Sequence, residues 1–308
     1  MTGVMVFVPA PQLTVTIEQQ HDQAELHVHA GGQGIWQARM ITSLGADVTL
    51  CATIGGEVGQ VLEPLLAGDG IRLRTVRGEA GSGWYVHDRR TGSREEIAEH
   101  PGDPLSRHEL DEVFSLALAE GLRAGIAVLS GPAHPSVVSP AVYRRLAADL
   151  GANGCRVIAD LSGDHLAAVL GAGLHVVKVS HEELIEDGRA ADDSTDELVR
   201  AVRSLHDDGA ETVLVSRADA GALALVDGRV YEVGMPMLTP AETRGAGDSM
   251  TAGVAATLAR GGGLLEAVRT GAAAGALNVT RHGLGTGHVD AVRVLTERVE
   301  LTPIGKDS

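Results

Sequence analysis

The segment of this sequence best suited to chemistry is a glycine-rich turn that ends in an acid. Residues 242–249 read ETRGAGDS, and an apolar helical pattern follows over about 250–260. Backbone N–H groups at a helix start, where the helix dipole is positive, can bind an anion. The unshielded N–H groups here belong to Gly245, Ala246 and Gly247. Asp248 would repel a bound phosphate, but it could deprotonate a hydroxyl that attacks phosphorus. The segment therefore predicts phosphoryl transfer, and a plain helix cap is the structural alternative.

Other phosphate and metal motifs are absent from the sequence or incomplete. There is no G-x-x-x-x-G-K-[ST] P-loop, and residues 32–37 begin like the dinucleotide motif G-x-G-x-x-G but lack its last glycine. His27 and His29 share a face of a predicted strand, but no third metal ligand is apparent beside them. These observations argue against a dinucleotide-dependent oxidoreductase and favour a solvated strand face over a metal site.

Two kinds of strand pattern must position these residues. Alternating apolar and polar residues are typical of sheets with one solvated face, and they predict two hairpins. The hairpin strands cover 13–18 and 24–29, then 83–88 and 93–99. Continuous apolar runs separated by helical patterns predict a parallel sheet between helices. These runs cover 4–8, 125–130, 155–160, 175–180 and 211–216.

Four of the predicted strands end in a small polar or acidic residue. These residues are Ser130, Asp160, Ser180 and Ser216. The carboxyl ends of parallel strands meet at one edge of the sheet, which is where open α/β sheets bind ligands. Helix capping explains any one of these residues equally well, so the expectation of a site at this edge depends on the four together.

Composition and charge restrict the class of protein. The chain has 308 residues, of which 44% are hydrophobic, enough for a sizeable globular core. Its net charge of −16 argues against nucleic acid as a partner. No apolar run approaches the ~20 residues of a membrane span, and the N-terminus lacks the basic region of a signal peptide. The two cysteines form no C-x-x-C motif, so we expect a protein of the reducing cytoplasm that binds neither nucleic acid nor membranes.

The order and spacing of five short motifs resemble the PfkB/ribokinase family of carbohydrate kinases, especially its 1-phosphofructokinase and tagatose-6-phosphate kinase branch. The motifs are Gly31-Gly32-Gln33-Gly34, Ser130-Gly131, Asp160-Leu161-Ser162-Gly163, Gly245-Ala246-Gly247-Asp248 and Ala273-Ala274-Gly275-Ala276-Leu277-Asn278-Val279. The resemblance implies an α/β, ribokinase-like fold: one kinase domain over 1–308, with lid hairpins inserted at about 12–30 and 83–99. It also implies ATP- and Mg²⁺-dependent phosphorylation of a hydroxyl group on a sugar or a sugar phosphate.

The resemblance further implies roles for particular residues. Asp248 would be the catalytic base, and the backbone of residues 245–247 would be the anion hole. The residues expected to bind the nucleotide are Lys178, Ser180, Glu183, Ser216, Ala218, Gly221, Thr243, Arg244, Gly275 and Asn278, and Glu183 would also hold Mg²⁺ through water. The residues expected to bind the acceptor are Gln12, Gly31, Gly32, Gln33, Trp36 and Asp248.

The acceptor side departs from the family pattern at several positions. Gln33 and Trp36 replace a lysine and an asparagine of the family's G-G-K-G-x-N, and Gln12 stands where a sugar-binding aspartate is expected. The stretch 81–85 lacks the arginine and asparagine of the branch's lid strand. Because a desolvated phosphate needs cations, we expect a cation-poor pocket for a less charged acceptor, such as a polyol or a nucleoside stacked on Trp36. Packing of Trp36 in the core is the alternative.

The nucleotide side departs less. Ser180 replaces an asparagine and Ala218 a glycine, changes that should leave ATP binding in place. The main hypothesis is therefore an ATP-dependent sugar kinase. A nucleoside kinase and a catalytically weak homologue that binds a sugar or a nucleotide are the alternatives. Unpaired strand edges in the lid also favour a homodimer formed through the lid.

Overall fold

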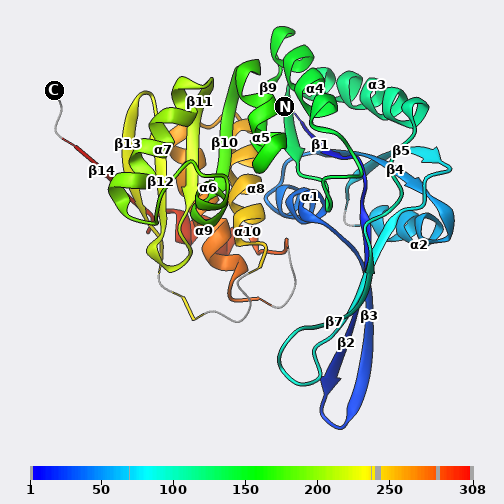
Figure 1. The fold of residues 1–308 in the computed structure, drawn as a ribbon. Coiled ribbons are helices and arrows are strands. Elements are labelled where there is room, and N and C mark those ends of the chain that lie inside the picture. Colours follow the sequence, from blue (N-terminus) through cyan, green and yellow to red (C-terminus); the bar gives the residue numbers. More distant parts are fainter. Residues whose placement is uncertain (1–2, 69, 237, 240–243, 282–284, 306–308) are drawn as a thin grey trace.

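The computed structural model describes residues 3–68, 70–236, 238–239, 244–281 and 285–305. Its main element is a ten-stranded sheet of order β14-β13-β12-β11-β10-β9-β8-β1-β4-β5 (Figure 1). The strands are β1 (Val4–Val8), β4 (Val48–Gly55), β5 (Arg72–Gly78), β8 (Ile126–Ser130), β9 (Arg156–Asp160), β10 (Leu174–Ser180), β11 (Ala210–Ser216), β12 (Ala222–Val226), β13 (Arg229–Gly234) and β14 (Glu300–Pro303). The pairs from β11 to β5 are parallel, and those that join β11, β12, β13 and β14 are antiparallel. The mainly parallel sheet predicted from the sequence is confirmed.

The continuous apolar runs form β1 and β8–β11, close to their predicted bounds. The other five strands were not predicted. In β5 the reason is its sequence, RLRTVRG, whose arginines lie on the outermost strand of the sheet and leave no continuous apolar run. Such a strand is recognised from its pairing with β4 rather than from its own residues.

Helices cover both faces of the sheet, as the βαβ rhythm predicts. The helices are α1 (Gln33–Ser43), α2 (Gly56–Leu66), α3 (Arg107–Ala124), α4 (Pro140–Ala152), α5 (Gly163–Val169), α6 (His181–Glu186), α7 (Thr195–Asp207), α8 (Ala246–Ala259), α9 (Leu264–Asn278) and α10 (Val289–Thr296). One buried core joins the sheet to α1, α2 and α8–α10. A second core on the opposite face joins it to α3, α4, α5 and α7. Among the described residues, no helix is both long and apolar enough to cross a membrane.

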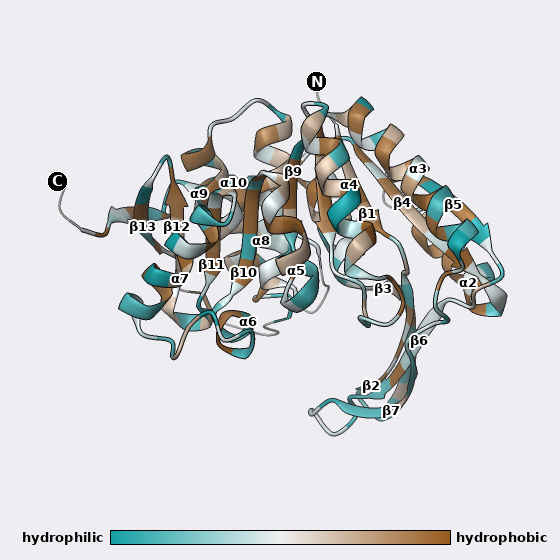
Figure 2. Ribbon diagram, turned by 45° about the horizontal axis from the view of Figure 1, so that its top comes forward, coloured by the Kyte–Doolittle hydropathy of each residue, from teal (hydrophilic) through white to brown (hydrophobic). Residues whose placement is uncertain are grey.

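A four-stranded sheet projects from this body (Figure 1). Its strands are β2 (Gln12–Gln20), β3 (Gln23–Gly31), β6 (Gly83–Asp88) and β7 (Glu95–His100). Parallel pairing of β2 with β6 joins the two predicted hairpins into one sheet, which we call the lid. Figure 2 shows that the brown, hydrophobic colour is concentrated in the body, whereas the lid mixes both colours along its strands.

Candidate active site

Asp160, the last residue of β9, is the centre of a buried hydrogen-bond network at the carboxyl edge of the sheet. One of its carboxylate oxygens accepts hydrogen bonds from Gln37 Nε2 at 2.8 Å and from Thr251 Oγ1 at 2.6 Å. Its other oxygen lies 3.5 Å from Lys178 Nζ. Ser130, which ends β8, donates its hydroxyl proton to Gln37 Oε1 at 2.5 Å. The network therefore ties two strand ends to α1 and α8.

Sequence reasoning missed Gln37 and Thr251. Gln37 is fully buried on the face of α1 that packs on the sheet, and its amide bonds Asp160 and Ser130 and reaches Asp248 at 3.5 Å. A glutamine on an otherwise apolar helix face was the available signal, because a buried amide needs partners on the neighbouring elements.

Asp248 lies in the first turn of α8, which begins at Ala246, earlier than the sequence pattern indicated. Its side chain is 9% exposed. The pKa of Asp248 is raised to about 8. Burial is the main cause, the negative charges of Asp160 and Glu183 act in the same direction, and Lys178 and the Gln37 hydrogen bond act against it. A carboxyl group with a pKa near neutral pH can exchange a proton during a reaction, as a general base must.

Lys178 lies directly under the glycine-rich turn. A Cβ atom at Gly247 would collide with Lys178 Nζ, so the turn needs glycine at this position. Burial by itself lowers the pKa of the Lys178 ammonium, but Asp160, Glu183 and Asp248 together raise it above its usual value. The ammonium therefore stays charged below the turn, where it adds to the positive end of the α8 dipole.

Gln33, at the start of α1, bridges two strand ends. Its amide nitrogen donates to the Asp160 carbonyl at 3.4 Å, and its amide oxygen accepts from the Gly131 N–H at 3.2 Å. Gly31 and Gly32 shape the chain before this helix: a Cβ at Gly31 would collide with Thr14, and Gly32 has a φ of +115°. In this arrangement Gln33 holds the edge of the sheet together.

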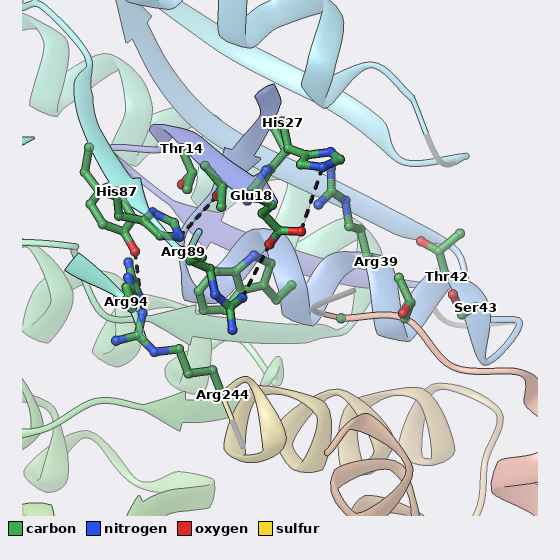
Figure 3. A pocket seen from close by; sticks show the side chains of 16 residues that line it. Thr14, Glu18, His27, Arg39, Thr42, Ser43, His87, Arg89, Arg94 and Arg244 are labelled. Atoms are coloured by element: carbon green, nitrogen blue, oxygen red, sulfur yellow. Dashed lines mark hydrogen bonds and ion pairs between the residues drawn. The ribbon is translucent and has the colours of Figure 1, made fainter. Parts of the chain in front are cut away.

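A cavity of about 720 Å³ lies between the lid, α1 and the turn before α8 (Figure 3). Its described lining contains four arginines, Arg39, Arg89, Arg94 and Arg244, and one carboxylate, Glu18. We call it the arginine cavity. This cavity is not the cation-poor pocket expected from the motif positions: arginines outside the family's acceptor motifs supply positive charge that the motif positions lack.

Trp36 and Tyr85 supply aromatic surface to the arginine cavity. Trp36 is half-buried, and its indole N–H has no hydrogen-bond partner among the described residues. This favours the cavity-lining interpretation of Trp36 over the core interpretation. Tyr85 stacks on His87, receives the Arg94 guanidinium 4.4 Å above its ring, and lies 3.5 Å from Arg244 through its hydroxyl.

Gln12 lies in a smaller cavity of about 380 Å³ that shares part of its lining with the arginine cavity. The shared residues are Tyr85, Arg94 and Arg244. The predicted acceptor residues Gln12 and Trp36 therefore border two cavities that meet at the same three side chains.

The predicted nucleotide residues form a second group, at the ends of β10 and β11. Ser180 and Ser216 are paired neighbours there. Ser180 and Glu183 form a capping box at the start of α6: the Ser180 hydroxyl accepts from the Glu183 N–H, and Glu183 Oε2 accepts from the Ser180 N–H at 2.7 Å. Ala218 has a φ of +46°, a conformation that strains any residue with a Cβ and explains why glycine fits the loop better.

Asn278 is fully buried at the end of α9 and uses both ends of its amide. Its nitrogen donates to the Arg244 carbonyl at 2.6 Å, and its oxygen accepts from the Gly285 N–H at 3.2 Å. It therefore links the residue before the glycine-rich turn to Gly285. Gly275, one turn earlier, allows α9 to approach the Ala246 carbonyl. Gly221, another predicted nucleotide residue, has a φ of +77°. Thr243, also predicted to bind the nucleotide, lies outside the described residues.

Comparison with known proteins gives one family. A model of the pfkB family of carbohydrate kinases matches residues 7–291. The chain is 31% identical to the ATP-dependent 6-phosphofructokinase isozyme 2 of Escherichia coli over 82% of both proteins. It is 28% identical to the 1-phosphofructokinase of Bacillus subtilis over 89% of this chain and 88% of that one.

The fold gives the same result. The crystal structure of Escherichia coli phosphofructokinase-2 in complex with fructose 6-phosphate matches with a TM-score of 0.82 at 27% identity, and covers 97% of this chain and 99% of that one. The ribokinase-like fold and the family expected from the sequence motifs are confirmed. The chain belongs to the pfkB family of carbohydrate kinases and is an ATP-dependent sugar kinase, a phosphotransferase with an alcohol group as acceptor.

Proposed function

We propose that Asp248 is the base of this kinase and that the acceptor is a sugar phosphate. In this mechanism, the Asp248 carboxylate takes the proton of a sugar hydroxyl while the hydroxyl oxygen attacks the γ-phosphorus of ATP and ADP leaves. The observation that carries the proposal is the buried position of Asp248 in the first turn of α8, with a pKa of about 8. The named relatives, both phosphofructokinases, support an acceptor that already carries a phosphate.

The transferring phosphoryl group would lie against the turn at residues 245–247. Backbone N–H groups of this turn point away from the helix, and the Lys178 ammonium lies below them. Arg244 directly precedes the turn and reaches the lid through Tyr85. Fixed donors of this kind stabilise the charge that spreads over the phosphoryl oxygens in the transition state.

Kinases of this family use ATP and a metal ion, and we propose Mg²⁺ as that ion. The described residues contain no group of three or more His, Cys, Asp or Glu side chains arranged to hold a metal. This fits Mg²⁺, which commonly keeps its waters and binds through nucleotide phosphates and one or two carboxylates. Glu183, which uses one carboxylate oxygen in the capping box, and Asp160 are the carboxylates nearest to Lys178 and Asp248 in this site. Bound Mg²⁺ would neutralise phosphate charge.

We also propose that all 308 residues form one kinase domain and that two copies pair through their lids. Alternate residues of β2 and β3 give one face of the lid an apolar surface. On this face Val15 pairs with Val28, and Ile17 pairs with Leu26. Leu26 is 65% exposed and Val28 41%. An exposed apolar sheet face of this kind favours association. We expect light scattering at micromolar concentration to give the mass of a dimer, and the mass of a monomer would contradict this. A cytoplasmic location stays a prediction.

The proposed chemistry is tested by measuring ADP release with ATP and Mg²⁺ over a panel of sugars, sugar phosphates, polyols and nucleosides. For the acceptor that turns over, Asp248→Asn should lower kcat by about 10²- to 10⁴-fold, because the amide cannot accept the proton. ATP binding, measured by calorimetry, should change little. Asp193→Asn, at an exposed loop position, is the matched control. Turnover in Asp248→Asn close to that of the control would overturn the assignment.

A further inference from the structure

The positive charge of the arginine cavity is unusual for this protein. The chain carries a net charge of −16, yet the described lining of the cavity has four arginines and one carboxylate. That carboxylate, Glu18, lies 3.7 Å from Arg89 and 3.8 Å from the His27 ring, so it is itself paired with one of the cavity arginines. A locally positive, partly enclosed surface on an acidic protein attracts an anionic ligand.

The arginines occupy two ends of the cavity. In Figure 3, Arg94 and Arg244 lie together near the start of α8, whereas Arg39 lies on α1 beside Thr42 and Ser43, on the opposite side of the lining. The end near α8 contains Arg244, which directly precedes the turn at residues 245–247, so in the proposed mechanism this end lies toward the transferring phosphoryl group. The other end is left for a group that belongs to the acceptor.

We propose that a phosphate group of the acceptor binds to Arg39 at the α1 end of the arginine cavity, with its sugar lying along Trp36, and that Arg39 determines the preference for a phosphorylated acceptor. This inference rests on the proposed function. The site differs from the motif positions of the family, because Gln33 occupies the motif lysine position and 81–85 lacks the lid arginine.

Like charges inside the cavity support this assignment. Burial lowers the pKa of Arg244, and the nearby charge of Arg89 lowers it further. At the other end, burial lowers the pKa of His29, with Arg39, His87 and His27 acting in the same direction. Cations held this close together repel one another, and an anion between them removes that cost.

The surface between the two ends suits a sugar. Trp36 offers aromatic surface to the cavity, whereas its indole N–H is buried. Hydroxyl groups of Thr16, Thr42 and Ser43 line the same cavity. Aromatic faces pack against apolar faces of a ligand, while hydroxyl groups exchange hydrogen bonds with its polar atoms.

The test compares Arg39→Gln and Arg39→Lys with Arg203→Gln, an exposed arginine on α7 as matched control. On the phosphorylated acceptor found in the panel, Arg39→Gln should raise KM about 10- to 100-fold and leave kcat within about threefold, because a charge-assisted hydrogen bond to the phosphate is lost. Arg39→Lys should recover part of the loss, and the KM for the unphosphorylated counterpart should not change. Equal melting temperatures would exclude a folding defect.

A preferred acceptor without a phosphate group would overturn the inference. So would a phosphorylated acceptor whose KM is unchanged in Arg39→Gln. If no acceptor turns over, the proposed function fails. The inference is then tested separately, by measuring sugar binding with calorimetry. Fructose 6-phosphate should then bind the wild-type protein more tightly than fructose does, and Arg39→Gln should remove that difference. Equal binding of the two sugars would overturn the inference.

Discussion

The side chains around Asp248 and those around the arginine cavity are held in different ways. Asp160, Gln37 and Lys178 are at most 6% exposed, and hydrogen bonds or an ion pair join them across α1, β9 and β10. The cavity arginines come from three separate segments, namely α1, the connection between β6 and β7, and the turn before α8, and the Arg89 side chain remains 29% exposed. A change at one member of the buried network alters several others, whereas a cavity side chain can change alone. Under the proposed function, the chemistry is therefore fixed, while acceptor recognition can be changed.

The strongest way to break this contrast is Gly247→Ala. The added methyl group collides with Lys178 Nζ, so the ammonium must leave its place beside Asp160 and below the anion hole. We expect kcat to fall about 10²- to 10³-fold, as when one fixed donor of an anion hole is removed. The melting temperature should change little, because a flexible side chain can move and alanine favours the helix.

Gly171→Ala is the matched control, because nothing lies within 4 Å of a Cβ placed there. Normal activity in Gly247→Ala would mean that Lys178 is not needed below the turn.

The second test is the pH dependence of kcat/KM, for which we expect a smaller effect than for Gly247→Ala. Below a pH of about 8 the Asp248 carboxyl is protonated and cannot accept a proton, so kcat/KM should fall about tenfold for each pH unit below that value and level off above it. Asp160→Asn removes a negative neighbour that raises the pKa of Asp248, so its rising limb should move to lower pH. A wild-type profile that stays flat down to pH 5 would contradict the role of burial.

The smallest effect is expected from Arg94→Lys in the cavity. Lysine keeps the charge and can still approach the Tyr85 ring, where the guanidinium carbon now lies 4.4 Å from the ring centre. Activity should stay within about threefold of wild type in the ADP-release assay. A loss as large as that of Gly247→Ala would show that the cavity is built as tightly as the catalytic centre.

Local residue patterns were sufficient for five of the ten main-sheet strands and for the helix start at the glycine-rich turn. The apolar runs behind β1 and β8–β11 have no other stable place than a covered sheet, and the sequence at 245–248 can form a helix start with free N–H groups wherever it stands. The lid hairpins could be predicted from the alternation of apolar and polar residues, because each of their strands has one solvent-exposed face.

Other features depended on contacts between segments far apart in the chain. Nothing in the neighbourhood of Gln37 or Asn278 in the sequence shows that their amides bridge separate elements. The arginine cavity was misjudged because its charge comes from Arg39, Arg89, Arg94 and Arg244, none of which lies at a motif position expected to bind a sugar phosphate.

The sequence by itself determined the fold class and the family, because these depend on local patterns and on short motifs, and it predicted the turn at residues 245–248 that we propose for phosphoryl transfer. The tertiary structure decided the buried state of Asp248 and the charge of the arginine cavity. Both are sums over side chains that folding alone brings together, since burial and electrostatic interaction act across space whatever the separation along the chain.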